Sequence, residues 1–167
     1  MSDAIAPPLL NGSCLCGAIK YTLAGEHAFT VLCHCNSCRK FTGSSFGANS
    51  LVDRKNLTVQ DPESKISVYG AQTADSGSSL VRSFCSACGS SLFVADGNGF
   101  PTHIAVTSGT MDDVQGVEGD GSDKLWTPKS EFFCKGKAMW LTTEVTIKRY
   151  GLWMKFSTPD QLVECIR

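Results

Sequence analysis

The segment GSCLCGAIKYTLAG, residues 12–25, joins a C-x-C motif directly to the pattern of a β-strand. Its apolar residues Ile19, Tyr21 and Leu23 alternate with polar ones, which is the two-residue period of a half-buried strand. A second motif, FCSACG at residues 84–89, also carries two closely spaced cysteines followed by glycine. Two such pairs can converge on one metal ion. These segments therefore predict a fold in which an N-terminal strand is fastened to the middle of the chain.

Most of the remaining chain also has the character of short strands separated by turns. Its strand candidates are rich in β-branched and aromatic residues and are bounded by Gly, Asp, Asn or Ser. They are HAFTVLC (27–33), NLTVQ (56–60), KISVYGA (65–71), SLVRSFC (79–85), SLFVAD (91–96), HIAVTSG (103–109) and EFFCKG (131–136). Only the C-terminus has helix signals, with Thr158 as a cap, Pro159 at the first helical position and Gln161 closing a capping box. We expect one mainly β domain over residues 1–167 with a short C-terminal helix.

Composition and charge restrict the class of partner. The 167 residues include 15 Lys and Arg against 16 Asp and Glu, with a formal net charge of −1. A nucleic-acid partner would normally be met by a basic face, so none is expected, and a small-molecule substrate is favoured. The N-terminal segment has neither the basic region nor the apolar run of a secretory signal, and no stretch is long enough to cross a bilayer. The expected location is the cytoplasm, and the oligomeric state is not assigned.

The nine cysteines point to metal rather than to disulfides. In a reducing compartment, clustered cysteines more often bind metal or carry out redox chemistry. An odd number also leaves one cysteine over in any disulfide framework. Seven of the nine fall into three tight groups, and Cys134 and Cys165 are solitary residues without an assigned role.

The first and third groups together predict a closed zinc site. Cys14 and Cys16 form one half of it, and Cys85 and Cys88 form the other, about 70 residues away. Zinc prefers four ligands in a tetrahedron, and the glycines that follow each pair permit a tight backbone turn. A structural zinc contributes on the order of 10 kcal/mol or more, so this site would clamp a folded sheet.

The second group, Cys33, Cys35 and Cys38, has one ligand fewer than a closed site requires. Three protein ligands and one open position are the arrangement of catalytic zinc. A fourth ligand from His34 or Cys134 would close the site instead. However, His34 should point away if both its neighbours point toward the metal, and a lone cysteine in an apolar strand is usually a small buried hydrophobe. The pattern favours the open site.

Five segments together resemble the glutathione-dependent formaldehyde-activating enzyme and centromere protein V family. They are GSCLCGAIKY, CHCNSCRKFTG, FCSACGSSLF, SGTMDD and KSEFFCKGKAMWL, and the match runs from about residue 11 to 141. The resemblance implies curled antiparallel sheets of the Mss4-like zinc-binding type. It also implies a structural zinc on the four cysteines of the closed site and a catalytic zinc on Cys33, Cys35 and Cys38. The tail, residues 142–167, has no part in the resemblance and is expected to pack on the domain.

The family resemblance implies a carbon–sulfur lyase that joins glutathione to formaldehyde, with two zinc ions per chain. Glutathione would be a co-substrate, and its thiol would enter the open position of the catalytic site. Arg39 and Lys40 could attract its carboxylates, although two solvated surface charges would look the same. Gly43 would permit a close approach or a turn, and no general acid or base is assigned. Two other functions stay open: a zinc isomerase or lyase of a biosynthetic pathway, and a non-catalytic zinc module.

Overall fold

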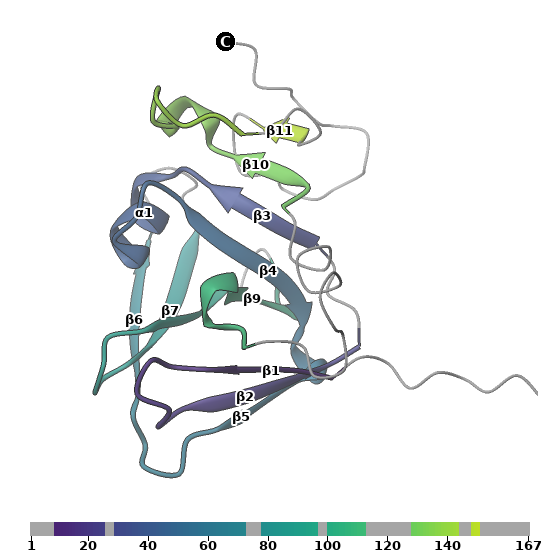
Figure 1. Ribbon diagram of the computed structural model, residues 1–167, viewed down its shortest axis with the longest axis vertical. Helices are drawn as coiled ribbons and strands as arrows, with labels where there is room; N and C mark the ends of the chain where they lie inside the picture. Colours follow the sequence, from purple (N-terminus) through teal and green to yellow (C-terminus); the bar gives the residue numbers. More distant parts are fainter. Residues whose placement is uncertain are drawn as a thin grey trace, which may run out of the picture.

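The computed structural model describes residues 9–25, 29–72, 78–96, 100–112, 128–143 and 148–150. Within these ranges the chain is mainly β, as the sequence predicts, with eleven strands and one α-helix (Figure 1). The strands are β1 (Leu9–Ser13), β2 (Lys20–Ala24), β3 (Phe29–Cys33), β4 (Gly47–Asp53), β5 (Leu57–Gln60), β6 (Ile66–Gln72), β7 (Ser79–Cys85), β8 (Ser91–Asp96), β9 (His103–Thr107), β10 (Ser130–Phe132) and β11 (Lys148–Tyr150). The helix is α1 (Asn36–Thr42), and the 3-10 turns are η1 (Arg54–Asn56), η2 (Ser108–Thr110) and η3 (Cys134–Gly136).

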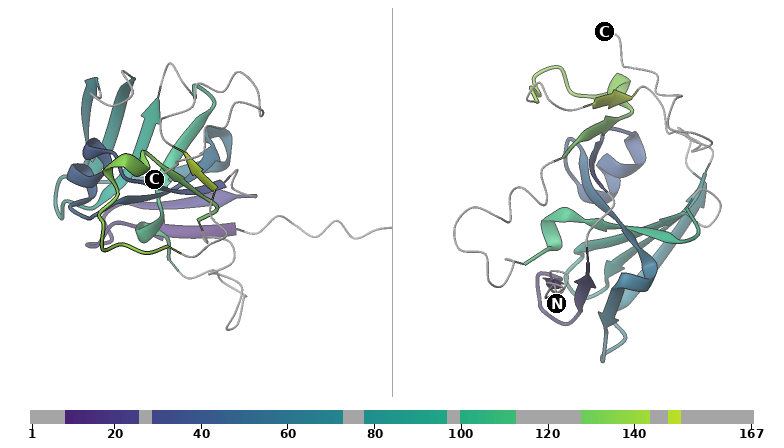
Figure 2. Two further views of the ribbon diagram at one scale, coloured as in Figure 1. Left: turned by 90° about the horizontal axis from the view of Figure 1, so that it is seen from above. Right: turned by 90° about the vertical axis from the view of Figure 1, so that its right-hand side faces the viewer.

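The described strands form two sheets. The smaller sheet has the order β1-β2-β5, and the larger has the order β11-β10-β3-β4-β9-β8-β7-β6. The strands of the smaller sheet run across the direction of β6 and β7, and the larger sheet curls over them (Figures 1 and 2). This crossed arrangement encloses a core between the two sheets and brings the end of β1 close to the end of β7.

Each expected strand forms part of a sheet, but four features of the fold were not predicted. Strands β1, β4 and β11 were missed, although β4 lies between β3 and β9 near the centre of the larger sheet. The β4 sequence GANSLVD begins with small and polar residues, so it lacks a clear two-residue alternation. The fourth feature is the parallel pairing of β10 with β3 and β11, whereas the resemblance implied antiparallel sheets.

The α-helix of the described residues was not predicted from the sequence. The helix α1 follows β3, and the expected helix after Thr158 lies outside the described residues. Seven residues without an apolar stripe are too few to show helical periodicity. Instead the ends define α1: the Cys35 side chain accepts a hydrogen bond from the Cys38 backbone N–H, and Gly43, at φ 63°, ends the helix.

Two apolar clusters stabilise the fold. The larger lies between the sheets and is centred on Ile19, Tyr21, Leu92 and Val106, each at most 1% exposed. Its aromatic contact is between Tyr21 and Phe93, whose ring centroids are 5.3 Å apart at a steep angle. The smaller cluster joins β3 to β10 and contains Val31, Cys33, Cys35, Phe132 and Phe133. Both clusters include cysteines, so four of the seven candidate metal ligands lie in the core, namely Cys14, Cys33, Cys35 and Cys85, whereas Cys16 is exposed.

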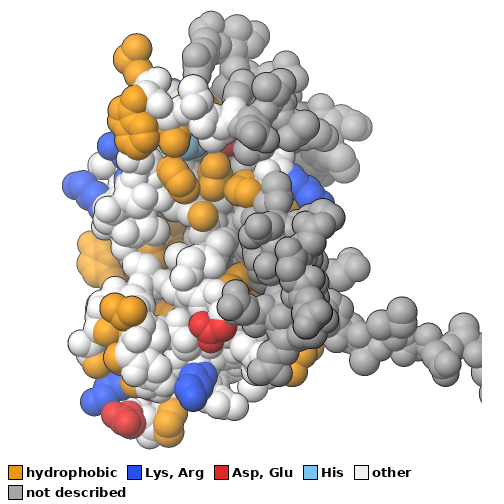
Figure 3. All heavy atoms as spheres, in the orientation of Figure 1, with side chains coloured by type: hydrophobic (Ala, Val, Ile, Leu, Met, Phe, Trp, Pro, Cys, Tyr) orange, Lys and Arg blue, Asp and Glu red, His pale blue; other side chains and the backbone are white. Residues whose placement is uncertain are grey.

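The face of the molecule that Figure 3 draws shows no dominant charge among its described residues. On the face drawn in Figure 3, the Lys and Arg side chains of the described residues stand apart from one another rather than in one patch. Among those residues, no helix has the length and apolar character that crossing a membrane would require.

Candidate metal centre

The four-cysteine cluster consists of Cys14, Cys16, Cys85 and Cys88. Their sulfur atoms all lie within 4.8 Å of one another, in an arrangement that could hold a metal ion. The Sγ atoms of Cys14 and Cys16 are 3.5 Å apart, and those of Cys16 and Cys85 are 3.8 Å apart. In a tetrahedral zinc site with Zn–S bonds of about 2.3 Å, the sulfurs would be about 3.8 Å apart. The cluster therefore fits a closed thiolate site for zinc.

Two glycine turns shape this cluster. The Gly17 N–H donates to the Cys14 carbonyl at 2.9 Å, and the Gly89 N–H donates to the Cys85 carbonyl at 2.8 Å. Both glycines have positive φ, 74° and 76°, in the region that other residues rarely adopt. Each turn reverses the backbone within a few residues, so both cysteines of its pair face the same point. The sequence predicted this role for the glycines.

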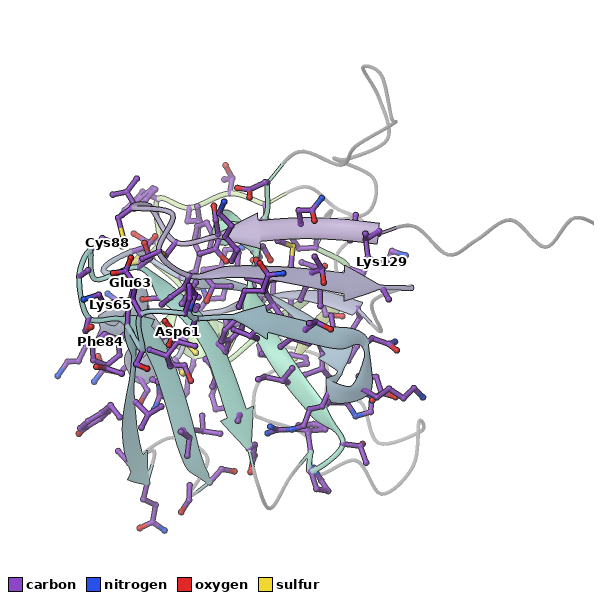
Figure 4. The ribbon with its side chains drawn as sticks, turned by 90° about the horizontal axis from the view of Figure 1, so that it is seen from below. Asp61, Glu63, Lys65, Phe84, Cys88 and Lys129 are labelled. Carbon is purple, nitrogen blue, oxygen red and sulfur yellow. The ribbon has the colours of Figure 1, made fainter. Side chains whose placement is uncertain are left out.

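The connection between β5 and β6 lies beside Cys88 and packs against the second cysteine pair. Figure 4 shows Cys88 beside the connection between β5 and β6, which carries Asp61, Glu63 and Lys65. The Ser86 backbone N–H donates to the Lys65 carbonyl at 2.8 Å. The Asp61 carboxylate in turn accepts the Lys65 backbone N–H at 2.7 Å. These contacts hold the second cysteine pair against the start of β6.

The three-cysteine cluster consists of Cys33, Cys35 and Cys38, at the junction of β3 and α1. Their sulfurs also lie within 4.8 Å of one another, and no other His, Cys, Asp or Glu among the described residues joins the group. Cys33 ends β3, Cys35 is the N-cap of α1, and Cys38 lies in its first turn. Cys35 and Cys38 lie three residues apart and so share one side of the helix start, and the end of β3 brings the Cys33 sulfur to the same point.

The two residues that could have closed this cluster lie elsewhere. The His34 ring points toward Glu131, with Nε2 and Oε1 3.1 Å apart. Cys134 is not in the strand where it was expected, because β10 ends at Phe132 and Phe133, at φ 56°, turns the chain into η3. Its thiol donates to the Glu131 carbonyl at 3.6 Å. Among the described residues the cluster therefore offers three candidate ligands.

The three thiols of this cluster share protons unequally when no metal is bound. Hydrogen bonds from the Cys33 and Cys38 thiols lower the pKa of Cys35 to about 3. Hydrogen bonding to Cys35 raises the pKa of Cys33, which burial raises further. For Cys38, the Cys33 hydrogen bond lowers the pKa, but Cys35 and burial outweigh it and raise the pKa to about 12. Thiols packed this closely favour a cation that would take the place of their protons.

A buried ion pair supports the three-cysteine cluster from β10. Glu131 is fully buried, and both of its carboxylate oxygens accept from Lys137 Nζ, at 2.9 and 3.0 Å. Burial raises the pKa of Glu131, but the Lys137 and His34 interactions outweigh it and lower the pKa below its usual value. Burial lowers the pKa of His34, so its ring is held neutral beside this pair.

The backbone strengthens the same connection. The His34 N–H donates to the Phe132 carbonyl at 2.9 Å. Gly136 passes so close to this loop that a Cβ atom there would lie 2.6 Å from the His34 carbonyl oxygen. Sequence reasoning missed Glu131 and Lys137 as partners of His34, because about 100 residues separate them from it.

An apolar pocket lies against the three-cysteine cluster. Cys33 and Cys38 line it together with apolar residues of β3, β4, β7, β8 and β10, including Phe29, Leu51 and Phe132. Its volume of about 50 Å³ exceeds the 10–15 Å³ needed for one water. The polar side chains of Asn49, Asp96 and His103 also reach it. A small molecule in this pocket would contact two of the three cysteines.

The proposed substrate contacts of the sequence lie outside this pocket. Arg39 and Lys40 are exposed in the last turn of α1, and neither lines the pocket. Gly43 is exposed and ends α1, which accounts for its turn role through its backbone conformation.

Fold and sites define a mainly β protein with two cysteine centres that could hold metal ions. The family model for glutathione-dependent formaldehyde-activating enzymes matches residues 9–136, so the chain belongs to that family. A Halomonas elongata protein named "Putative glutathione-dependent formaldehyde-activating enzyme" is 37% identical over 53% of this chain. An uncharacterized lyase of Schizosaccharomyces pombe is 32% identical over 55% of it. The matches span 57% and 61% of those relatives' own lengths.

One solved structure that matches the chain is the crystal structure of a Rhodobacter sphaeroides protein. It is 21% identical, with a TM-score of 0.48, and the match covers 65% of this chain and 90% of that one.

Proposed function

We propose that this protein is a zinc-dependent carbon–sulfur lyase that joins the thiol of glutathione to formaldehyde. The observation that carries this proposal is the three-cysteine cluster, which has no fourth ligand among the described residues and borders an apolar pocket. A purely structural cluster would be expected to have a closed shell like that of the four-cysteine cluster. Membership of the formaldehyde-activating family supports the same chemistry.

The two clusters have different roles in this proposal. Cys14, Cys16, Cys85 and Cys88 hold a structural zinc, and Cys33, Cys35 and Cys38 hold a catalytic one. All seven donors are thiols, a soft set that suits zinc better than magnesium or calcium. Zinc at the catalytic site would act as a soft Lewis acid that keeps a substrate thiol ionised at neutral pH.

The protein itself supplies binding, orientation and exclusion of water. The apolar wall formed by Phe29, Leu51 and Phe132 shields the side of the cluster on which Cys33 and Cys38 lie. The buried Glu131–Lys137 pair and the neutral His34 ring fix the loop that carries the cysteines. In the reaction the substrate sulfur bonds to the carbonyl carbon, and the proton lost from sulfur ends on the former carbonyl oxygen. The reaction needs neither oxidant nor reductant.

Two broader assignments belong to this proposal. The chain functions as one domain in the cytoplasm, where a reducing environment keeps clustered thiols available for metal. Its partners are small molecules.

Exchange spectroscopy by ¹³C NMR tests the activity directly, because glutathione and formaldehyde also combine without an enzyme. Zinc-loaded protein should accelerate the exchange between free formaldehyde and its glutathione adduct. The variant Cys35→Ser should abolish the acceleration. Cys134→Ser, which changes a cysteine outside both clusters, should retain it. The proposal fails if wild-type protein with both clusters metal-loaded leaves the exchange rate at its uncatalysed value.

A further inference from the structure

Asn49, on β4, places a polar side chain in the apolar pocket. The residue is 7% exposed and lines the pocket together with Cys33 and Cys38. Its side-chain amide can donate two hydrogen bonds from Nδ2 and accept others at its oxygen. Within the described ranges of the chain, this amide has no hydrogen-bond partner. Buried polar groups are normally hydrogen-bonded, so the amide is available to a molecule in the pocket.

The strand register brings Asn49 close to the three-cysteine cluster. Asn49 pairs with Val31, and Gly47 pairs with Cys33, so Asn49 lies one step along the same face of the sheet from the first cysteine. A Cβ atom at Gly47 would lie 3.2 Å from Asn49 Nδ2 and also 3.2 Å from the Cβ of Cys38. The amide nitrogen therefore leans back along β4 toward the cluster.

The other two polar side chains of the pocket, those of Asp96 and His103, lie at its opposite end. Asp96 is the last residue of β8 and His103 is the first of β9, and these two strands are antiparallel. His103 pairs with Asp53 at the end of β4, whereas Cys33 pairs with Gly47 at its start. Six residues of strand correspond to about 20 Å. Asn49 is thus the polar side chain that the pocket places nearest to the cysteines.

The proposed reaction needs a hydrogen-bond donor on the oxygen side of the aldehyde. When the substrate sulfur bonds to the carbonyl carbon, the electron pair of the C=O π bond moves onto the oxygen, which then takes up a proton. Negative charge therefore grows on this oxygen in the transition state. A donor that is already in place stabilises this charge and contributes about 100- to 1,000-fold in rate. The apolar side chains of the pocket cannot supply one.

We propose that Asn49 is a catalytic residue that donates a hydrogen bond from Nδ2 to the aldehyde oxygen while the carbon–sulfur bond forms. This inference rests on the proposed function and deepens it by naming the residue that faces the oxygen. Asn49 keeps both of its amide protons, and the proton on the product oxygen replaces the one that the thiol releases. An amide suits this position because it donates without bringing a charge into an apolar pocket.

The ¹³C exchange experiment on zinc-loaded, full-length protein tests this role through Asn49→Leu, which nearly keeps the shape of the side chain and removes the donor. The acceleration should fall by about 100- to 1,000-fold, and by the same factor across neutral pH, because an amide does not titrate. Asn56→Leu is the matched control: Asn56 ends η1, is not a lining residue of the pocket, and should leave the rate unchanged. If Asn49→Leu does not fold, Asn49→Ser, whose hydroxyl reaches less far, should lose at least about tenfold.

Two measurements without turnover separate a contact with the oxygen from mere support of the cluster. Asn49→Leu should keep two zinc ions and the sulfur neighbour that glutathione adds to the X-ray absorption spectrum, because the amide faces the aldehyde rather than the thiol. In ¹⁵N-labelled wild-type protein, the side-chain amide signal that Asn49→Leu lacks should move downfield when glutathione and formaldehyde are added together. Glutathione alone should leave this signal in place.

Loss of zinc or of thiol binding in Asn49→Leu would overturn the assignment, because Asn49 would then only support the cluster. An amide signal that does not respond to formaldehyde would also overturn it. If wild-type protein accelerates the exchange and Asn49→Leu does so equally, the lyase stands and the role of Asn49 alone fails. If wild-type protein does not accelerate the exchange, the lyase fails and this role fails with it.

Discussion

Replacing Cys85 by serine should destabilise the whole protein, because this residue fastens two distant parts of the chain. Cys85 ends β7 and is fully buried, and its sulfur lies 3.8 Å from that of Cys16, 69 residues earlier. Serine is a poor ligand for zinc, which prefers thiolate. The variant should therefore open the four-cysteine cluster and release the β1–β2 hairpin from β7.

The size of the effect follows from the length of the loop that the cluster closes. Treated as a cross-link across 69 residues, the connection is worth about 4 kcal/mol of chain entropy. A domain of this size is stable by about 5–15 kcal/mol in total, so the loss removes a large share of it. With a urea m-value of about 1–3 kcal/mol/M, the unfolding midpoint should fall by about 1–4 M. The zinc affinity that is lost adds to this figure.

Urea unfolding followed by circular dichroism, in buffer that contains zinc, measures this change. Cys134→Ser is the matched control, since Cys134 is partly buried but lies outside both clusters. Its midpoint should shift by less than about 0.5 M, because Cys134 is only partly buried and a serine hydroxyl can also donate to the Glu131 carbonyl. If Cys85→Ser unfolded at the wild-type midpoint with two zinc ions bound, the four-cysteine cluster would not be a structural metal site.

Three further predictions concern the metal content, the open position and the core. Wild-type protein should contain two zinc ions, and Cys35→Ser should lose one of them. The variant should keep its far-ultraviolet circular dichroism, because the three-cysteine cluster closes only a local loop. Loss of both ions would contradict this prediction. X-ray absorption of the zinc-loaded protein should gain one sulfur neighbour at about 2.3 Å when glutathione is added, and an unchanged spectrum at saturation would refute thiol binding at that site. Burial raises the pKa of Tyr21, so the folded protein favours the neutral phenol. The stability that Tyr21 contributes is therefore fully present below the ordinary tyrosine pKa of about 10 and is lost as the pH rises above 10. Tyr21→Phe should weaken the fall of the unfolding midpoint between pH 9 and pH 11, and an identical fall in both proteins would count against this explanation.

The local parts of the two centres are determined by the sequence itself. Cys33, Cys35 and Cys38 lie within one turn and its flanks, so their spacing alone predicts that they meet. The same holds for each cysteine pair followed by Gly17 or Gly89, because those turns form from hydrogen bonds between near neighbours. Most strands were also predictable, since alternation and β-branched residues are local signals.

Tertiary structure decided everything that joins distant segments. Strand β4 lacks a clear alternation, and its place between β3 and β9 depends on its neighbours. The parallel pairing of β10 with β3 and the Glu131–His34 contact each join residues about 100 positions apart. Spacing in a sequence says nothing about which of many distant partners will meet.

Arg82 shows the same limit most clearly. In the sequence it is one of 15 basic residues, flanked by Val81 and Ser83 in a strand pattern. Only the curl of the larger sheet turns its side chain toward Cys38 and Phe41 and buries it. Whether a charged side chain meets water or the protein interior depends on the packing of elements far apart in the chain, so the grouping of the cysteines could be predicted from the sequence but the surroundings of the two clusters could not.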